Sequence, residues 1–538
     1  MAPRFAVRSV AIIGAGSSGL TAARYIQAQG VYDRIVVYEQ RSQVGGIWNH
    51  SYRPTDQEHI PQESPYLRPD APLQPREGKA EAPEFPTATY DDLYVNIPHP
   101  LMGFTDLSIQ EVHEANHPGQ PLPIFPHRQT IAEYLISYSQ EVRHLIRFNT
   151  KVHDVRLFKR PRPNGQVDDF VDSWEIHSAN TVDGSGSVEK FDAVLVAQGH
   201  YDITFVPHIA NIEAFQEAHP GVLTHSKRYR NPDKFRGKKV IVVGNQASGL
   251  DIAAQIHSVV EGPMYLSVHT PTISEGLKRL TGAEEVPEIQ EFLVEERGVR
   301  LADGRLIRDV DIVLFCTGYL FSLPFLQREK PTGENPLGDL LSNGRRIHRL
   351  YDDMFHIDHP TLAFLCLPMK VVPYPLAQAQ AALVARVWNN TLELPSTEEM
   401  NEWEKEAEMV RGPTFHVWPQ GDDGIYINAL YQRITEGSES VASRAGKEPP
   451  RWNNYLVWMR RVALAGKVKF EEGGHKATTL AELGYIYDED EEKKKNEEAK
   501  QAEVVEKINA QFTGVTGYIH PRMAKIETTP FVSVYSGA

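Results

Sequence analysis

Three glycines near the start of the chain, Gly14, Gly16 and Gly19, have the spacing of a loop that binds the pyrophosphate of a dinucleotide. Gly14 would permit a tight turn, Gly16 a close approach of the backbone to the phosphates, and Gly19 close packing of helix on strand. An apolar strand, residues 10–13, precedes the loop, and a helix whose N-terminus attracts phosphate follows it. This order favours a nucleotide site over a simple glycine turn. The expected contacts are Gly14, Gly16, Ser17, Ser18 and Gly19.

An acidic residue stands where the ribose of such a nucleotide would bind. Glu39 follows a second apolar strand, residues 34–38, and lies 20 residues after Gly19, which is the offset of a ribose-binding acid. Its carboxylate would repel a 2'-phosphate, so we expect this site to hold FAD or NAD rather than NADP. Further along, a glycine pair and a planar side chain favour contact with the same ligand, although a buried turn remains the alternative. This part of the site comprises Glu39, Gln40, Gly46, Ile47 and Trp48.

A second copy of the glycine loop follows the apolar run at residues 240–243, at an offset of 230 residues from the first. Gln246 replaces the middle glycine and should hold a pyrophosphate slightly further from the backbone. Two dinucleotide sites in one chain imply two nucleotides and hydride transfer between them. The alternative is a structural βαβ unit that binds nothing. The residues expected to contact the second nucleotide are Gly244, Asn245, Ala247, Ser248 and Gly249.

The second site lacks the acid of the first. His269 lies 20 residues after Gly249, and the expected strand before it, residues 265–268, is not followed by a carboxylate. A 2'-phosphate would therefore not be repelled, and His269, Lys278 or Arg279 could contact it. This favours NADPH over NADH only in part, because the arginine usually expected in such a site is missing.

The elements that must position these loops alternate between strands and helices, which predicts an α/β fold with two Rossmann-like dinucleotide-binding domains, the second inserted into the first. A strand at residues 310–316 should return the chain to the first domain through Thr317, Gly318 and Tyr319, and a helix at residues 376–388 carries Gln380. We also expect a helix at 130–144, strands at 151–159, 173–179, 191–197 and 360–367, a proline-rich irregular segment at 53–89, and a solvated charged helix at 488–503. The expected domains are 1–205 (first dinucleotide-binding domain, first part), 206–318 (second dinucleotide-binding domain), 319–484 (first domain, second part) and 485–538 (charged tail).

Composition excludes several classes of function. The 538 residues carry a formal charge of -15, so there is no basic surplus to neutralise the phosphates of a nucleic acid. No apolar run is long enough to span a membrane, and no signal peptide is visible, so we expect a cytoplasmic protein. Two cysteines, Cys316 and Cys366, cannot form a disulfide framework or the close redox pair of an FAD-dependent disulfide reductase. No histidine and acid spacing favours a metal site.

Together these motifs resemble the flavin-containing monooxygenases, class B flavoproteins, and in particular their fungal members. The resemblance extends from about residue 10 to residue 400. The family signature F-x-G-x-x-x-H-x-x-x-Y/F is matched by Gly221, His225 and Tyr229, with His219 in place of the phenylalanine. The other matching motifs are the loops at 14–19 and 244–249 and the segments 45–48 (Gly-Gly-Ile-Trp) and 315–319 (Phe-Cys-Thr-Gly-Tyr).

The resemblance implies FAD in the first site, NADPH in the second and O2 as co-substrate, so that 1–205 and 319–484 would form the FAD-binding domain and 206–318 the NADPH-binding domain. It implies a flavin C4a-hydroperoxide that oxygenates a soft nucleophile, N or S, of a small molecule. In the family, an asparagine in a Tyr-x-x-Leu-x-x-Asn stretch lies beside the flavin and helps to hold this intermediate; Asn96 has the matching position after Tyr90 and Leu93.

Other functions stay open at this point. Related Baeyer–Villiger ketone monooxygenases end the signature in Trp followed by Pro or Asp, whereas here Tyr229 is followed by Arg230. An FAD-dependent NADPH oxidoreductase that does not oxygenate a substrate, and a nucleotide-binding module without enzymatic activity, are further alternatives. The sequence does not identify the substrate, and a homodimer is left open as the assembly.

Overall fold

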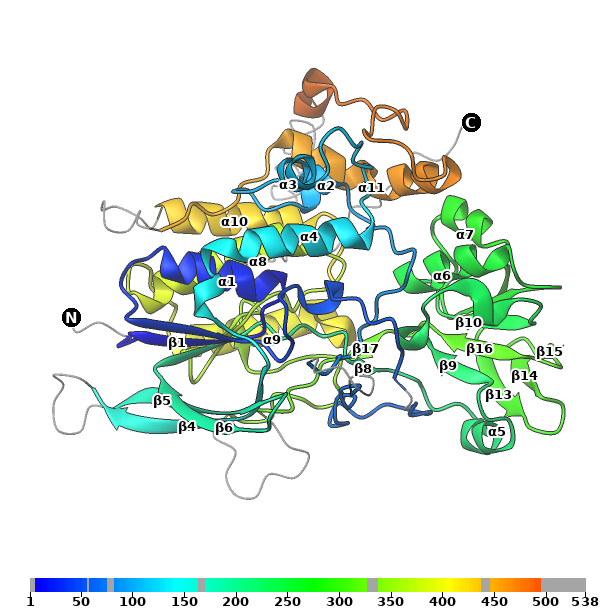
Figure 1. The fold of residues 1–538 in the computed structure, drawn as a ribbon, viewed down its shortest axis with the longest axis horizontal. Helices are drawn as coiled ribbons and strands as arrows, with labels where there is room; N and C mark the ends of the chain where they lie inside the picture. The colour runs from blue at the N-terminus through cyan, green and yellow to red at the C-terminus, as the bar shows by residue number, and fades with distance from the viewer. Residues whose placement is uncertain are drawn as a thin grey trace, which may run out of the picture.

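The protein is built on two sheets of mainly parallel strands, and each sheet carries one of the glycine loops at the carboxyl end of a central strand (Figure 1). The computed structural model describes residues 5–55, 58–74, 82–162, 170–326, 337–436 and 446–494. The mixed α/β architecture predicted from the alternation of elements is confirmed.

The first sheet has seven strands in the order β18-β19-β20-β7-β1-β2-β3, of which β20, β7, β1, β2 and β3 run parallel. Alternate residues of the central strand point to opposite faces: Val10 and Ile12 belong to one apolar cluster, and Ala11 and Ile13 to another. Both faces of β1 are therefore buried, which explains its continuous apolar sequence. The strands are β1 (Ser9–Ile13), β2 (Arg34–Tyr38), β3 (Ile146–Arg147), β7 (Ala193–Val196), β18 (Leu350–Tyr351), β19 (Phe355–His356) and β20 (Leu362–Phe364).

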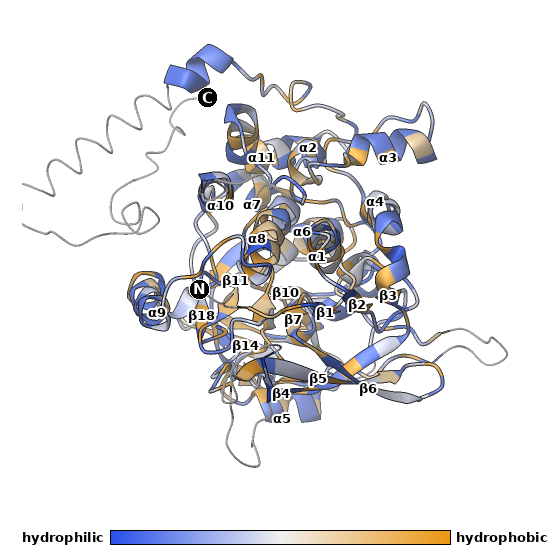
Figure 2. Cartoon of the chain, turned by 90° about the vertical axis from the view of Figure 1, so that its left-hand side faces the viewer, coloured by the Kyte–Doolittle hydropathy of each residue, from blue (hydrophilic) through white to orange (hydrophobic). Residues whose placement is uncertain are grey.

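Different layers cover the two faces of this sheet. Figures 1 and 2 show helices on one side and the antiparallel sheet β4-β5-β6 on the other. Helix α8 packs against α1, and nearly all of its residues are buried. The helices around the first sheet are α1 (Ser17–Gln27), α2 (His99–Met102), α3 (Ile109–Asn116), α4 (Arg128–Tyr138), α8 (Pro373–Trp388), α9 (Thr397–Arg411), α10 (Asp422–Glu436) and α11 (Asn454–Glu472), and the outer strands are β4 (Thr150–Pro161), β5 (Phe170–Asn180) and β6 (Gly186–Phe191).

The second sheet has five parallel strands in the order β12-β11-β10-β16-β9. All five lie within the segment 206–318, although the division into domains itself stays a prediction. The strands are β9 (Leu223–His225), β10 (Val240–Val243), β11 (Tyr265–Val268), β12 (Glu284–Pro287) and β16 (Ile312–Phe315). The elements around them are α5 (Ile212–Ala218), α6 (Ala247–His257), α7 (Glu275–Thr281) and the antiparallel strands β13 (Ile289–Leu293), β14 (Gly298–Leu301) and β15 (Leu306–Ile307). Two short strands, β8 (Ile203–Thr204) and β17 (Tyr319–Leu320), pair where the chain passes between the two sheets.

Several elements differ from their predicted extent. The predicted helix 130–144 ends as α4 at Tyr138 and continues as two 3-10 turns, because the Ser139 hydroxyl donates to the carbonyl of Ile136. The predicted strand 191–197 is interrupted at Asp192, whose carboxylate accepts hydrogen bonds from the backbone N–H of Arg8 and Ser9. The helix predicted at 376–388 begins earlier, and the strand predicted at 360–367 is shorter.

The charged segment 488–503 is described only as far as residue 494. Residues 489–494 are helical. The predicted solvated face is present in this described part, where residues 488–491, 493 and 494 are exposed; only Glu492 is buried, and its carboxylate pairs with Arg461 of α11. Within the described ranges, every helix is too short or too polar to cross a membrane.

Candidate active site

The first glycine loop adopts a backbone that only glycine can supply. Gly14 has a φ of 103°, and a Cβ at this position would lie 2.6 Å from the carbonyl oxygen of Ala197 at the end of β7. A Cβ on Gly19 would collide with the carbonyl oxygen of Gly14. The Gly14 N–H donates to the carbonyl of Tyr38 over 2.9 Å, which ties the loop to β2. The predicted tight turn and the predicted close packing of α1 on β1 are therefore both present.

The second loop repeats this geometry. Gly244 also has a φ of 103°, and a Cβ there would lie 2.7 Å from the carbonyl oxygen of Cys316. A Cβ on Gly249 would collide with the carbonyl oxygen of Gly244. The Gly244 N–H donates to the carbonyl of Ser267 over 2.9 Å, as Gly14 does to β2. The two loops differ in accessibility, because Gln246 and Ala247 are exposed where the matching residues of the first loop are half-buried.

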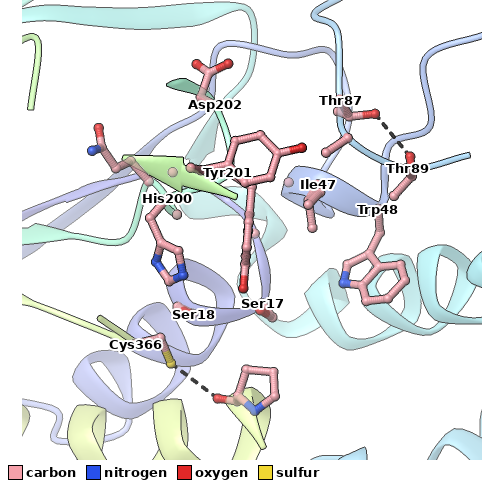
Figure 3. Close-up of a pocket in the computed structure, with 18 of the residues that line it drawn as sticks. Ser17, Ser18, Ile47, Trp48, Thr87, Thr89, His200, Tyr201, Asp202 and Cys366 are labelled. Atoms are coloured by element: carbon pink, nitrogen blue, oxygen red, sulfur yellow. Dashed lines mark hydrogen bonds between the residues drawn. The ribbon is translucent and has the colours of Figure 1, made fainter. Parts of the chain in front are cut away.

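Both loops border one cavity of about 560 Å³, a volume within the usual range of ligand pockets, about 300–1,000 Å³. Figure 3 shows Ser17 and Ser18 on one wall, with Ile47 and Trp48 beside them. Ala247 and Ser248 at the N-terminus of α6 line the same cavity. The sequence-predicted residues that line it are Gly14, Gly16, Ser17, Ser18, Glu39, Gln40, Gly46, Ile47, Trp48, Asn96, Ala247, Ser248 and Tyr319.

The glycine pair before Trp48 lies over the first loop. Gly45 and Gly46 have φ values of 118° and 56°. The Gly45 N–H donates to the carbonyl of Ala15 over 3.0 Å. A Cβ on Gly46 would lie 3.1 Å from the Cα of Gly16, so the two segments approach each other closely only because both are glycine. The two segments therefore pack directly against each other, which holds residues 46–48 beside the first loop at the cavity wall.

Glu39 is buried at the edge of the first loop. Its Oε2 accepts a hydrogen bond from the N–H of Ala15 over 2.9 Å, and its Oε1 accepts one from the N–H of Arg41 over 2.9 Å. The carboxylate thus lies against the loop that would carry the pyrophosphate, at the cavity wall. A carboxylate in this place can accept hydrogen bonds from ribose hydroxyls and would repel a 2'-phosphate.

Seven of the predicted contacts do not line this cavity: Gly19, Gly244, Asn245, Gly249, Thr317, Gly318 and Gln380. Asn245 donates to the carbonyl of Thr270 over 2.8 Å and so links the second loop to the segment after β11. Thr317 donates to the carbonyl of Phe205. Gln380 is buried behind the wall, where its Oε1 accepts the N–H of Cys366 over 2.8 Å. Gln380 therefore supports the wall, and a direct contact between Gln380 and a cofactor stays a prediction.

Asn96 has an exposed side chain at the cavity wall. Among the described residues it makes no hydrogen bond with another side chain or with the backbone. Its amide is therefore available to a ligand. Nothing in the local sequence other than the family resemblance singles it out, because the residues around it have no helical or strand periodicity.

Sequence reasoning missed several wall residues that the fold brings together from distant segments. His200 and Tyr201 follow β7, and Cys366 follows β20 (Figure 3). Burial lowers the pKa of His200 to about 4, so its imidazole is neutral at physiological pH, and burial raises the pKa of the Cys366 thiol to about 12. The Cys366 thiol donates to the carbonyl of Pro373 over 3.3 Å. Cys366 is therefore an unreactive thiol, which agrees with the absence of a close cysteine pair in the sequence.

The cations considered for a 2'-phosphate in the second site are already paired. Nδ1 of His269 lies 2.8 Å from the carboxylate of Glu288, and Nζ of Lys278 lies 3.7 Å from Glu285. Arg279 pairs with Glu472 of α11. Glu285 lies in β12, and Glu288 follows this strand directly. Both come close to the end of β11 because β12 pairs with β11, so counting residues along the chain from β11 does not reveal them. A 2'-phosphate in this place would meet carboxylates as well as cations.

The histidine of the signature segment joins the two sheets. His225 ends β9, and its Nε2 lies 3.2 Å from the carbonyl of Gly318, next to β17. Its backbone N–H donates to the carboxylate of Glu58 over 2.6 Å. Burial lowers the pKa of His225 to about 3, so it is neutral and donates through Nε2. The segment thus connects the second sheet to the chain that returns to the first.

The residues present fit a dinucleotide at each loop. In both loops the first and last glycines lie where a Cβ would collide with the backbone, and both loops lead into the N-terminus of an α-helix of eleven residues. Of the described residues, no group of three or more His, Cys, Asp or Glu side chains could hold a metal ion.

A profile of the flavin-binding monooxygenase-like family matches residues 79–274 and 277–432, and one of NAD(P)-binding Rossmann-like domains matches residues 12–69. The chain is 29% identical over 470 residues to a thiol-specific monooxygenase of Saccharomyces cerevisiae, covering 86% of this chain and 92% of that protein. It is 30% identical over 406 residues to flavin-containing monooxygenase FMO GS-OX-like 9 of Arabidopsis thaliana, covering 74% and 79%. Among solved structures, the S-allyl-L-cysteine S-oxygenase of Allium sativum superposes with a TM-score of 0.66 at 23% identity, covering 92% of this chain and 99% of that one.

Proposed function

Because the chain belongs to the flavin-binding monooxygenase-like family, we propose that it is an FAD- and NADPH-dependent monooxygenase that oxygenates a sulfur or nitrogen atom of a small molecule. The family supplies the class of reaction. The two cofactors and the substrate class are proposed from the residues of this chain.

The observation that carries the proposal is the single cavity shared by the two glycine loops. Ser17 and Ser18 open α1, Ala247 and Ser248 open α6, and all four line the same space. Two helix N-termini that face one cavity supply two sites for the phosphates of two nucleotides. Nucleotides that share a cavity can exchange a hydride, whereas nucleotides in separate pockets cannot.

The chain offers different chemistry to the two nucleotides. On the first loop, the carboxylate of Glu39 favours FAD, whose ribose carries no 2'-phosphate. On the second loop, no carboxylate follows β11 as Glu39 follows β2, and His269 and Lys278 lie nearby, which favours NADPH; Glu285 and Glu288, which pair with these cations, oppose this preference. When bound, the flavin supplies the oxygen chemistry and the nicotinamide the hydride.

The wall residues would bind and protect the reacting groups rather than activate the substrate. Trp48, Met102 and Tyr374 give the cavity an apolar lining, and such a lining excludes water from a reactive site. The free amide of Asn96 can donate a hydrogen bond to an oxygen atom in the cavity. His200 is neutral, so it adds no charge to the wall.

Sulfur is the first substrate class to test. The relative from Saccharomyces cerevisiae is a thiol-specific monooxygenase, and the match extends over 86% of this chain. A thiol or thioether is a soft nucleophile that needs no catalytic base.

The experiment follows oxygen uptake by the purified, flavin-loaded protein with NADPH or NADH and a thiol, a thioether, a tertiary amine or a ketone. Oxygenated product in proportion to NADPH, with a thiol or thioether but not the ketone, is expected. Ester or lactone formation from the ketone would identify a Baeyer–Villiger enzyme. NADPH oxidation that releases only hydrogen peroxide with every substrate would contradict the proposal.

A further inference from the structure

A line of hydrogen-bonding side chains connects the cavity wall with solvent. Thr87 and Thr89 line the cavity beside Ile47 and Trp48, and their hydroxyl oxygens lie 3.1 Å apart (Figure 3). Behind them, Nδ1 of His50 lies 3.1 Å from the Thr89 hydroxyl.

The line ends at the surface. Nε2 of His50 lies 3.0 Å from Oδ1 of Asp91. The His50 side chain is 3% exposed, whereas that of Asp91 is 38% exposed. The other carboxylate oxygen of Asp91 accepts the amide of Asn231 over 3.0 Å, which fixes its orientation. A buried imidazole thus stands between a cavity hydroxyl and a solvent-accessible carboxylate.

The hydrogen bonds in this line can run in two directions, and the two arrangements differ by one proton. If Thr87 donates to the carbonyl of Asn49, 3.0 Å away, Thr89 must donate to Thr87 and His50 Nδ1–H to Thr89. Nε2 of His50 then faces the Asp91 carboxylate without a proton, so a hydrogen bond between His50 and Asp91 requires one additional proton. If the line runs the other way, Nε2–H donates to Asp91 and no further proton is needed.

We propose that Thr89, His50 and Asp91 form a relay that carries one proton per turnover from solvent into the cavity. This inference rests on the proposed monooxygenase reaction. That reaction uses one O2, a hydride from NADPH and one proton, and yields the oxygenated substrate, NADP+ and one water. The hydride provides two electrons and the substrate the other two, so that one oxygen atom leaves as water and the other stays on the substrate.

The transfer itself needs only groups on this line. A proton taken up by Asp91 moves to Nε2 of His50, the proton on Nδ1 moves to the Thr89 hydroxyl, and Thr89 releases its own proton to the acceptor in the cavity. The imidazole returns to its first tautomer before the next turnover. The cavity thereby receives a proton without admitting bulk water.

The charges around His50 suit a carrier that does not store the proton. Burial, together with the guanidinium groups of Arg128 and Arg230, lowers the pKa of His50 to about 4, and Asp91 opposes this shift only in part. The ring of Tyr52 packs edge-on against the imidazole at 4.7 Å and does not belong to the line. His50 is therefore neutral at pH 7 and is charged only during transfer.

The test compares His50→Gln, Asp91→Asn and the control Tyr52→Phe in the flavin-loaded enzyme, with NADPH, O2 and a thioether. His50→Gln should slow product formation at least about tenfold, since proton transfer by a positioned group contributes about 10²–10⁴-fold. Flavin reduction by NADPH without O2 should be unchanged, and Tyr52→Phe should behave as wild type. In His50→Ala, added imidazole should restore most of the rate, and the solvent isotope effect of the wild type should change in each relay variant.

A rate within twofold of wild type for His50→Gln and for Asp91→Asn would overturn the relay. The relay would also be overturned if both variants lost rate equally in anaerobic flavin reduction and imidazole failed to restore His50→Ala, because this pattern indicates a purely structural role. If His50 variants do not retain flavin, Asp91→Asn decides by its isotope effect and pH profile. A wild-type enzyme that forms no oxygenated product contradicts the proposed function rather than the relay.

Discussion

Replacing Gly14 by alanine tests which nucleotide each glycine loop binds. The substitution places a Cβ 2.6 Å from the carbonyl of Ala197 and forces alanine into a φ of 103°. Backbone strain of this kind costs about 1–3 kcal/mol, and overpacking against a fixed neighbour costs about another 1–3 kcal/mol. The loop can escape only by moving away from β7, which displaces the backbone that would approach the pyrophosphate.

The expected effect on the flavin follows from this cost. A loss of about 2 kcal/mol, the lower end of the sum, corresponds to about 30-fold weaker FAD binding. Flavin content after gel filtration and titration of the apoprotein with FAD measure the change. Gly30→Ala is the matched control, because its φ is also positive, 69°, but nothing lies within 4 Å of the added Cβ. The control should lose a little stability and keep its flavin.

Gly244→Ala provides the complementary measurement. Its geometry is nearly the same, with the Cβ 2.7 Å from the carbonyl of Cys316. We expect this variant to retain FAD and to show a KM for NADPH raised by about 30-fold or more, from the same energies. If Gly14→Ala kept its flavin and raised only the KM for NADPH, our assignment of the two loops would be reversed.

Three further predictions concern the wall, the second site and pH. Asn96→Ala should keep its flavin but release hydrogen peroxide in place of part of the oxygenated product; an unchanged ratio of product to NADPH would remove Asn96 from the reaction. Glu288→Gln should lower the KM for NADPH several-fold and leave that for NADH unchanged, because the carboxylate lies 2.8 Å from His269 and would repel a 2'-phosphate; equal changes for both nucleotides would contradict this reason. Stability should fall as the pH drops from about 6.5 towards 4, because burial lowers the pKa of His99 to about 4 and that of His225 to about 3, so the unfolded chain binds these protons first. Each such histidine contributes up to about 1.4 kcal/mol per pH unit, and urea unfolding at pH 7 and pH 5 should show a shallower dependence for His99→Phe than for the wild type.

Local patterns predicted the frame of the protein well. The strand, loop and helix around Gly14 and around Gly244 are encoded within about 20 residues each, and backbone sterics alone require glycine there. The strand predicted at 265–268 coincides with β11. Two of the elements whose ends were wrong, the predicted helix 130–144 and the predicted strand 191–197, are interrupted where a single side chain forms a hydrogen bond with the backbone.

The parts of the site that could not be predicted depend on contacts between distant segments. His50 and Asp91 are 41 residues apart and lie at either end of a segment without helical or strand periodicity. Gln380 was expected at the cofactor, but the packing of α8 places it behind Cys366. The carboxylate of Glu288 reaches His269 only because β12 pairs with β11. No spacing along the chain encodes such neighbours.

The unequal accessibility of the two loops has a kinetic consequence. The first loop is half-buried and lies under Gly45 and Gly46, whereas Gln246 and Ala247 of the second are open to solvent. The first nucleotide should therefore dissociate slowly and remain with the polypeptide for many catalytic cycles, as a prosthetic group does. The second should exchange with the surrounding pool in every cycle, as a co-substrate does. One duplicated βαβ unit would thus provide both a permanent and a renewable redox partner, and the difference would lie in how much chain covers each loop.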